Sequence, residues 1–495
     1  KDNILLYIIN KQMVNYSCED CGKEYSQKSH YDSHKRRKKP CKKEINRINI
    51  LEEKIEKLEK IIINNNTSTY TVLNDYNTLK NYYNNNLNVD KSLVVTSNDE
   101  PTPIECVEEM VNVIDDQFWK NNNLKILDPC CGCGNFFLVI LQKLKKYHSL
   151  QHILENMLYF NDINIDRINI VKKVFLNDTY NINITTENFL DYNPTLKYNL
   201  IVANPPYAKL LPNGKRASKN HNLIGVFINK SLELLEDKGL LLYITPNNWM
   251  SCADRNILIK ELTKKQILYL DIHTAKKYFK KIGSSFTWYL IENTPSYKDI
   301  AINCLWKKKL YKDTIRSEER SYIPLLYNKI IQNILHKTTD NTTHERFNVQ
   351  TSSDLHKYTK KSCISKTPDE TFKYKLIHTP SQTVWANRPH KYQDGYKIFI
   401  STTSYYKIFI DKCGMTQSIA FIQCSNEDEA NQLKQILEHP LYVFINNICR
   451  WGNFNNVRIL QKFPKPNVDN VQDKEVIYNY FNITKEEQSF IENHV

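Results

Sequence analysis

The chain has 495 residues, with 68 Lys and Arg against 54 Asp and Glu, which gives a formal net charge of +14. Its length exceeds what one hydrophobic core supports, so we expect about two to four domains. A charged content of 25% and an aromatic content of 11% exclude a fully disordered chain. No apolar run approaches the roughly 18 residues of a membrane span.

Thirteen cysteines, sparse and unevenly spread, argue against a secreted disulfide scaffold. The composition therefore predicts an intracellular protein that does not enter membranes, located in the cytoplasm or the nucleus. A bias toward Asn, Lys, Ile and Tyr suggests an AT-rich genome such as that of a large DNA virus or a protist. A viral source would place the protein in a viral replication compartment. The basic charge favours nucleic acid as a partner.

Residues 1–44 carry the spacing of a small zinc finger. Cys18, Cys21, His34 and Cys41 follow the pattern Cys-x2-Cys-x12-His-x6-Cys, and His30 is an alternative fourth ligand. Tyr25 and Tyr31 occupy the usual small-core positions between the ligand pairs. We expect one structural zinc ion here. The basic tract over 35–43 is either a DNA-binding or nuclear-address segment or a solvated helix face.

Residues 45–63 have apolar positions at heptad spacing, which predicts a short helix. This helix is either a coiled coil that forms a homodimer or a single amphipathic helix. Residues 64–92 are rich in Asn, Thr and Tyr and are expected to be a linker.

Residues 93–298 show an alternation of strand and helix patterns that predicts a mainly parallel, Rossmann-like α/β sheet. The expected strands are one ending at Asp128 and then Met157–Asp162, Ile182–Phe189, Tyr198–Ala203, Leu240–Thr245, Ile267–His273 and Phe286–Ile291. The expected helices are Glu105–Val113, one running through Phe136–Leu144, Ile168–Phe175 and Asn222–Leu235, the last closed by a turn over Glu236–Gly239.

Two glycines follow the first strand in the segment Asp-Pro-Cys-Cys-Gly-Cys-Gly. Strand, Gly-x-Gly turn and helix is the arrangement by which doubly wound sheets present a nucleotide-like ligand. Gly132 would let the backbone approach the ligand, and Gly134 would let helix and strand pack closely. Phe137 occupies the place of the third glycine in a dinucleotide fingerprint, which argues against NAD. Asp162, at the end of the second strand, lies where a ribose diol is usually held.

The fourth strand ends in Asn204-Pro205-Pro206-Tyr207. Two prolines stiffen the turn, so that the Asn204 side chain and the Pro205 carbonyl become fixed acceptors. An exocyclic amine on an aromatic ring is a poor nucleophile, and two acceptors on its N–H groups localise its lone pair. Tyr207 supplies a face for a planar base. This tetrapeptide therefore predicts a site that activates such an amine as a nucleophile.

On these motifs, residues 102–293 resemble the S-adenosylmethionine-dependent amino-methyltransferases, specifically the γ-class DNA adenine-N6 methyltransferases of type II restriction–modification systems. The order of motifs, with a long C-terminal remainder, is typical of the γ class. The resemblance implies that Thr102 and Pro103 contact the methionine part of the cofactor, that Asp128, Gly132 and Gly134 form its loop, and that Asp162 binds its ribose. Asn188 and Phe189 would hold its adenine, with Asn188 where the family has Asp. Phe286 would stack on a flipped base, or else belong to the core.

The resemblance also implies that residues 299–495 form an α+β target-recognition domain with a helical tail. In this region we expect strands over Tyr396–Ser401, Tyr405–Asp411 and Ser418–Cys424 and a helix over Glu427–Glu438. Double-stranded DNA contacts are expected from the loop carrying Lys209, Lys215, Arg216 and Lys219. Arg388, His390, Lys391 and Trp451 are further candidates, with an ordinary surface position as the alternative.

We therefore expect a site-specific DNA adenine methyltransferase with S-adenosylmethionine as cofactor, structural zinc, and a companion restriction endonuclease as a further partner. The alternatives are a protein-glutamine methyltransferase, an RNA-base methyltransferase and a catalytically inactive zinc-finger DNA-binding protein.

Overall fold

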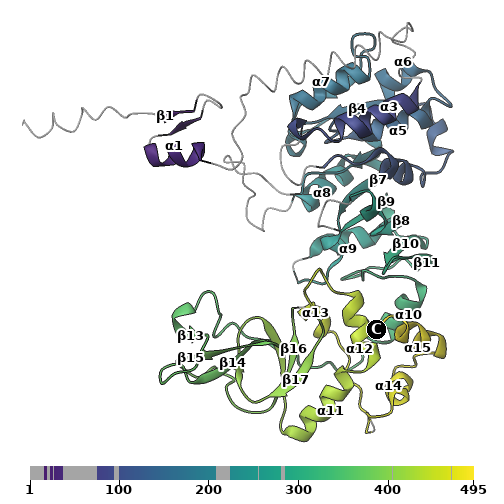
Figure 1. The fold of residues 1–495 in the computed structure, drawn as a ribbon. Coiled ribbons are helices and arrows are strands. Elements are labelled where there is room, and N and C mark those ends of the chain that lie inside the picture. The colour runs from purple at the N-terminus through teal and green to yellow at the C-terminus, as the bar shows by residue number, and fades with distance from the viewer. Residues whose placement is uncertain are drawn as a thin grey trace, which may run out of the picture. The chain divides into compact units, whose positions relative to one another are not determined.

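The computed structural model describes residues 16–18, 23–25, 27–36, 75–93, 100–207, 223–254, 256–279, 285–403, 405–469 and 471–495. The chain divides into two compact units. Figure 1 shows the ribbon coloured by residue number. One comprises residues 1–100 and 165–181, and the other comprises residues 101–164 and 182–495. Within the described ranges, none of the helices combines the length and the apolar character that crossing a lipid bilayer requires.

The first unit contains a small hairpin followed by a helix. Strands β1 (Tyr16–Ser17) and β2 (Glu24–Tyr25) pair antiparallel, and α1 (Lys28–Lys35) follows. The rings of Tyr25 and Tyr31 lie 6.3 Å apart, between hairpin and helix. The unit also includes α3 (Tyr76–Tyr82), a π-helical turn (Tyr83–Leu87), a 3-10 turn (Lys91–Leu93) and α7 (Ile165–Val174).

The expected linker is wrong over its second half. Residues 76–87 are helical because Leu79, Tyr82, Tyr83 and Leu87 recur at helical spacing and are all buried. The Asn-rich composition of this stretch conceals that pattern. The expected helix over 45–63, with the homodimer it could form, and the rest of the linker up to residue 74 lie outside the described residues.

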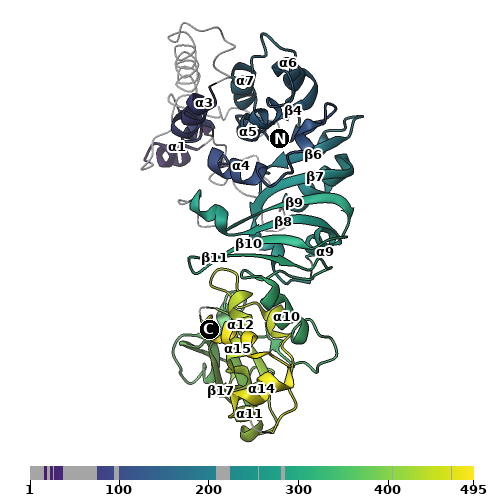
Figure 2. The ribbon, with the colours of Figure 1, turned by 90° about the vertical axis from the view of Figure 1, so that its right-hand side faces the viewer.

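The second unit is built on a nine-stranded sheet of order β11-β10-β8-β9-β7-β6-β3-β4-β5 (Figure 2). Strands β9 and β11 run antiparallel to their neighbours and the other seven are parallel, so the prediction of a mainly parallel α/β sheet is confirmed. The strands are β3 (Ile126–Asp128), β4 (Leu158–Asn161), β5 (Asn183–Thr185), β6 (Tyr198–Ala203), β7 (Leu235–Pro246), β8 (Lys265–Ile272), β9 (Phe286–Pro295), β10 (Ile300–Trp306) and β11 (Lys309–Ile315).

Helices of this unit pack on the sheet through apolar side chains. Ile228 of α8 and Leu262 of α9 share one hydrophobic cluster with Leu241, Tyr289 and Leu270 of the strands. The helices are α4 (Ile104–Val111), α5 (Asn135–Leu144), α6 (Leu150–His152), α8 (Ile224–Leu234) and α9 (Ile257–Lys264), with 3-10 turns over Phe118–Lys120, Phe189–Asp191, Asn247–Met250 and Thr274–Lys277 and a π-helical turn over Ile153–Met157.

Two boundaries differ from the predictions. Residues 236–239 are not a helix cap, because α8 ends at Leu234 and β7 begins at Leu235. Lys238, not Gly239, has the positive φ, of 61°. A Cβ on Gly239 would lie 2.9 Å from the carbonyl oxygen of Glu236, so this glycine serves close packing. The sheet expected to end before residue 298 also continues past it, since β10 and β11 extend it.

The remainder of the chain is α+β, as expected. It contains two four-stranded sheets, of order β12-β19-β16-β17 and β13-β15-β14-β18. The strands are β12 (Gln350–Thr351), β13 (Ile364–Ser365), β14 (Tyr374–Thr379), β15 (Gln382–Ala386), β16 (Lys397–Ser401), β17 (Ile408–Asp411), β18 (Gly414–Met415) and β19 (Ile419–Gln423). The helices are α10 (Lys329–Lys337), α11 (Glu427–Leu437), α12 (Pro440–Ile448), α13 (Val457–Leu460), α14 (Lys474–Tyr480) and α15 (Lys485–Glu492), with a 3-10 turn over Lys361–Cys363.

Candidate active site

The predicted site residues gather at one edge of the nine-stranded sheet. Strands β3, β4, β6, β7 and β8 are parallel, so their carboxyl ends meet at that edge (Figure 2). Strand β9 runs the other way and therefore begins there. Asp128, Asp162, Asn204 and Phe286 are thus brought together by topology, although they are spread over almost 160 residues of sequence.

The loop after β3 has the backbone that its glycines predict. Gly132 and Gly134 have φ values of 57° and 90°, in the left-handed region that favours glycine. The Gly132 N–H donates to Oδ2 of Asp162 at 2.9 Å. Among the described residues, apart from Gly132 itself and its two chain neighbours, no heavy atom lies within 4 Å of the position that a Cβ of Gly132 would occupy. The loop therefore presents open space beside a carboxylate.

Asp128 anchors the start of this loop. Its Oδ1 accepts the Cys130 N–H at 3.2 Å, and burial raises the pKa of this carboxyl well above its usual range. The Cys130 thiol in turn donates to the backbone carbonyl of Asn204 at 3.6 Å. This contact connects the glycine loop directly to the turn after β6.

Asn161 is a positioning residue that sequence reasoning missed. The residue is 1% exposed, and its side chain contacts the loop after β3, strand β5 and the loop after β5. Its amide nitrogen donates to the carbonyls of Pro129 and Glu187 at 2.9 and 3.0 Å, and its oxygen accepts from the Thr185 hydroxyl at 2.8 Å. The signal available in the sequence was an Asn immediately before Asp162, at the end of an expected strand.

The other predicted cofactor residues flank the loop. Thr102 is buried, and its carbonyl accepts the side-chain amide of Asn135, the first residue of α5, at 2.8 Å. Pro103 is the N-cap of α4. Asn188 caps the following 3-10 turn by accepting the Leu190 N–H at 3.3 Å. Phe189 is buried, with its ring 5.2 Å from that of Phe227.

The turn after β6 places an amide oxygen and two aromatic rings side by side. Pro205 is buried, Pro206 is exposed, and the Tyr207 hydroxyl donates a short hydrogen bond to Oδ1 of Asn204. The ring of Tyr207 lies 6.2 Å from that of Phe286, tilted by 48°. The amide oxygen of Asn204 and these two rings therefore lie close together at the carboxyl edge of the sheet.

Two further residues hold the start of β9. The Asn247 N–H donates to the Ser285 carbonyl at 3.2 Å, and the His273 N–H donates to the Phe286 carbonyl at 3.1 Å. Burial lowers the pKa of His273 to about 4, so the ring is neutral near physiological pH. His273 has a φ of 71°, which is uncommon for a residue other than glycine. Both residues immediately follow a strand end, and that was the signal in the sequence.

The predicted zinc ligands are only partly described. Cys21 and Cys41 lie outside the described residues, and within those residues no three His, Cys, Asp or Glu side chains gather in a way that could hold a metal ion. Cys18 and His34 are buried, whereas the alternative ligand His30 is exposed on α1.

The residues predicted to contact DNA differ in exposure, and some of them lie outside the described residues. The loop with Lys209, Lys215, Arg216 and Lys219 lies outside the described residues. Arg388 is half-exposed and pairs with Asp354 at 2.8 Å. The expectation for His390 is wrong, because its ring is buried and bonded to the Ser352 hydroxyl at 2.8 Å. Trp451 is half-buried and Lys391 is exposed.

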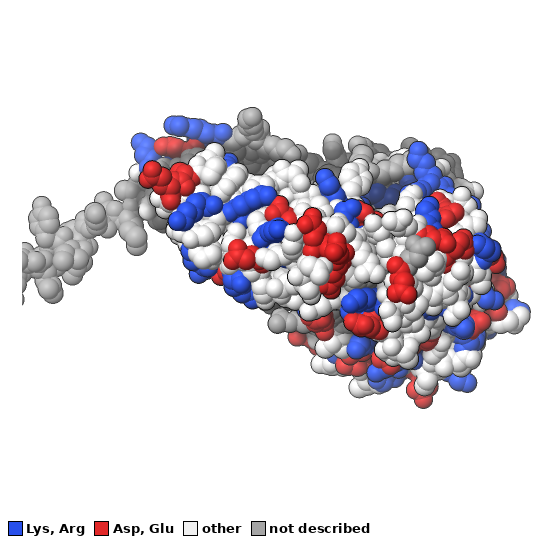
Figure 3. All heavy atoms as spheres, turned by 90° about the horizontal axis from the view of Figure 1, so that it is seen from below, with Lys and Arg blue, Asp and Glu red and all other residues white. Residues whose placement is uncertain are grey.

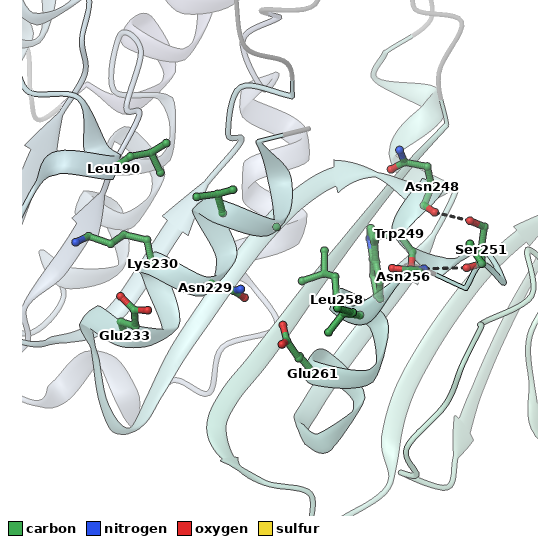
Figure 4. A pocket seen from close by; sticks show the side chains of 14 residues that line it. Leu190, Asn229, Lys230, Glu233, Asn248, Trp249, Ser251, Asn256, Leu258 and Glu261 are labelled. Atoms are coloured by element: carbon green, nitrogen blue, oxygen red, sulfur yellow. Dashed lines mark hydrogen bonds between the residues drawn. The ribbon is translucent and has the colours of Figure 1, made fainter. Parts of the chain in front are cut away.

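A separate open groove of about 830 Å³ lies between α8 and α9 (Figure 4). Lys230 and Glu233 of α8 and Leu258 and Glu261 of α9 line it, together with Trp249. None of the predicted catalytic or cofactor residues lines this groove, so the carboxyl edge of the sheet remains the candidate site.

Residues 104–279 match the model of the Eco57I restriction-modification methylase family. The match covers the glycine loop, the Asn204–Tyr207 turn and the strands up to β8.

Several restriction-modification proteins are similar to parts of the chain. The type II methyltransferase M.AccI of Acinetobacter calcoaceticus is 25% identical over 169 residues, which are 30% of this chain and 29% of the relative, so less than a third of that relative is spanned. A nuclease-deletion mutant of the Type ISP restriction-modification enzyme LlaGI, solved with a DNA substrate mimic, has a TM-score of 0.51 at 12% identity, over 85% of this chain and 56% of that one. The structure of the Type IIL restriction-modification enzyme MmeI in complex with DNA has a TM-score of 0.48 at 11% identity. The match covers 88% of this chain and 71% of that one.

Proposed function

We propose that this protein is a DNA methyltransferase that transfers a methyl group from S-adenosylmethionine to N6 of an adenine flipped out of double-stranded DNA. The observation that carries the proposal is the contact between the glycine loop and the Asn204–Tyr207 turn, made by the Cys130 thiol. A cofactor on the loop and an amine at the turn would be neighbours at the same sheet edge.

The residues at the loop suit the cofactor. The open space at Gly132 lets a ligand approach the backbone, and Asp162 beside it offers a carboxylate to a ribose diol. Thr102 and Pro103 would border the methionine part, and Asn188 and Phe189 the adenine. S-adenosylmethionine supplies a methyl group on a positively charged sulfur.

The turn suits an aromatic amine. Oδ1 of Asn204 and the Pro205 carbonyl would accept the two N–H groups, which localises the lone pair of the amine nitrogen. The proton leaves after the new N–C bond has formed, so the site needs no strong base. Tyr207 and Phe286 would stack on the base and favour its flipped position, against an unstacking cost of a few kcal/mol.

The rest of the chain would recognise DNA. We propose that the α+β region after β11 is a target-recognition domain, and that a separate restriction endonuclease accompanies this chain. M.AccI is a type II methyltransferase, and the LlaGI and MmeI structures contain DNA or a mimic of it, which supports DNA as the substrate class.

We further propose that residues 18–41 bind one structural zinc ion through Cys18, Cys21, His34 and Cys41. The support is a hairpin followed by a helix, with Cys18 1% and His34 5% exposed. Zinc content by mass spectrometry of the purified chain tests this, with Cys18→Ser as the variant that should lose the metal.

The test of the activity is incubation with labelled S-adenosylmethionine and mixed duplex DNA, followed by digestion to nucleosides. N6-methyladenine is expected, and Asn204→Ala should abolish it while leaving cofactor binding in calorimetry unchanged. N4-methylcytosine would refute the adenine assignment. Label that enters RNA or protein glutamine in competition, and not DNA, would refute the substrate class.

A further inference from the structure

The net charge alone does not locate a surface for DNA. The face drawn in Figure 3 carries basic and acidic side chains interspersed with each other. Position relative to the candidate active site distinguishes one group of basic residues, the lysines of the turn between β10 and β11, which lies at the same sheet edge.

This turn is unusually tight for its residues. Trp306 pairs with Lys309, so only Lys307 and Lys308 form the connection. Their φ values are 46° and 70°, both in the left-handed region, as a type I′ turn requires. Such turns favour Asn-Gly or Gly-Gly. Two lysines in this conformation keep positive charge where glycine would remove backbone strain, and strained backbone of this kind is concentrated at functional positions.

The turn lies on the same sheet edge as the site. Strand β10 is parallel to β8, and Cys304 is in register with Ile272, the residue before His273. The β10–β11 turn therefore projects from the edge that carries Asn204 and Phe286. In sheet order β10 is separated from β6 by four strand steps, or about 19 Å at about 4.8 Å per step. That is about six base steps of about 3.4 Å along a duplex.

The turn is exposed and braced. Lys307, Lys308 and Lys309 are exposed, and no carboxylate within the described ranges pairs with any of them. The Lys307 ammonium donates to the His494 carbonyl at 3.3 Å, and the Tyr311 hydroxyl contacts Nε2 of His494 at 2.6 Å. Contacts of Lys307 and Tyr311 with His494, beyond α15, thus brace the hairpin that carries Lys308 and Lys309.

We propose that the β10–β11 turn, through Lys308 and the adjacent Lys309 of β11, binds backbone phosphates of the DNA about six base steps from the flipped base. This proposal rests on the proposed function and names the surface that holds the duplex at the active-site edge. The contact is to backbone phosphate, so it adds affinity for any sequence and none for a particular one.

The test is the salt dependence of duplex binding by full-length protein, measured by fluorescence anisotropy. Each phosphate contact contributes about 0.9 to the slope of log K against log salt concentration. Lys308→Gly removes the charge and relieves the positive φ, so folding is retained or improved. We expect its slope to be shallower by about 0.9, equally on specific and unrelated duplexes.

Lys298→Ala is the matched control. Lys298 precedes β10 at the opposite sheet edge, is exposed, and lies 5.5 Å from the Tyr297 ring, much as Lys309 lies 5.1 Å from the Tyr311 ring. For Lys298→Ala, the slope of log K against log salt concentration should equal that of the wild type. A wild-type slope in Lys308→Gly, in a protein that methylates DNA, overturns the turn proposal alone. Absence of methyl transfer by the wild type overturns the proposed function.

Discussion

Asp271 should make the protein less stable as pH rises. The residue lies near the end of β8, and its Oδ1 accepts the N–H and hydroxyl of Thr274 at 3.1 and 2.6 Å. Its Oδ2 is buried without a hydrogen-bond partner among the described residues. Burial raises the pKa of Asp271 from its ordinary 3.8 to about 7, although the Thr274 hydrogen bonds act in the opposite direction.

The sign follows from proton binding. The folded state keeps this proton up to about pH 7, while the unfolded chain releases it near 3.8, so the folded state binds more protons between these values. The free energy of unfolding therefore falls as pH rises through this window. At about 1.4 kcal/mol per pH unit, the loss between about pH 5 and about pH 8.5 is about 3 kcal/mol.

Asp271→Asn keeps an acceptor for Thr274 and cannot ionise. Urea unfolding of both proteins should give an advantage to the variant that grows by about 3 kcal/mol between about pH 5 and about pH 8.5. Asp354→Asn is the control, since the hydrogen bond from Arg388 lowers the pKa of Asp354 to about 2, below this window. If the difference in free energy of unfolding between Asp271→Asn and the wild type changes as little with pH as it does for the control, the reasoning is refuted.

Three substitutions test the site itself. Asn161→Ala should lower the free energy of unfolding by about 3 kcal/mol, because it leaves buried carbonyls without donors, and thermal unfolding would measure this. Gly132→Ala should cost about 1–2 kcal/mol through its positive φ and weaken S-adenosylmethionine binding in calorimetry; unchanged affinity would contradict the loop assignment. Phe286→Leu should slow methyl transfer by roughly 10- to 100-fold, from about 1–3 kcal/mol of lost stacking, with cofactor affinity retained. A full rate in initial-velocity measurements would place Phe286 in the core only.

Local patterns predicted much of the fold. The strands of the sheet are short apolar runs that end in polar residues, and Gly132 and Gly134 mark their loop by type and spacing alone. Asp128, Asp162 and Asn204 therefore lie where the sequence predicts them, at the carboxyl edge of the parallel strands. Composition misled where it hid periodicity, as in the helix of Tyr76–Tyr82, whose Asn-rich neighbours suggested a linker.

Long-range pairing could not be predicted from local patterns. That β10 joins the nine-stranded sheet depends on its pairing with β8, for example Ile302 with Leu270, and an apolar strand can pair in many places. Burial of His390 depends on Gly414, where a Cβ would lie 2.6 Å from the Cβ of His390. The role of Asn161 depends on carbonyls from separate loops that only the folded sheet brings together.

The hydrogen bond from Tyr207 to Asn204 means that an incoming amine must either use the second lone pair of Oδ1 or displace a donor already in place. Displacing it subtracts about 1 kcal/mol from binding, roughly a fivefold loss of affinity, whichever amine arrives. A small free amine or a lone side-chain amide has little else with which to offset this loss. A planar ring that also slides beside Tyr207 and Phe286 offsets it through contact area, so discrimination against small nucleophiles is built into the resting turn.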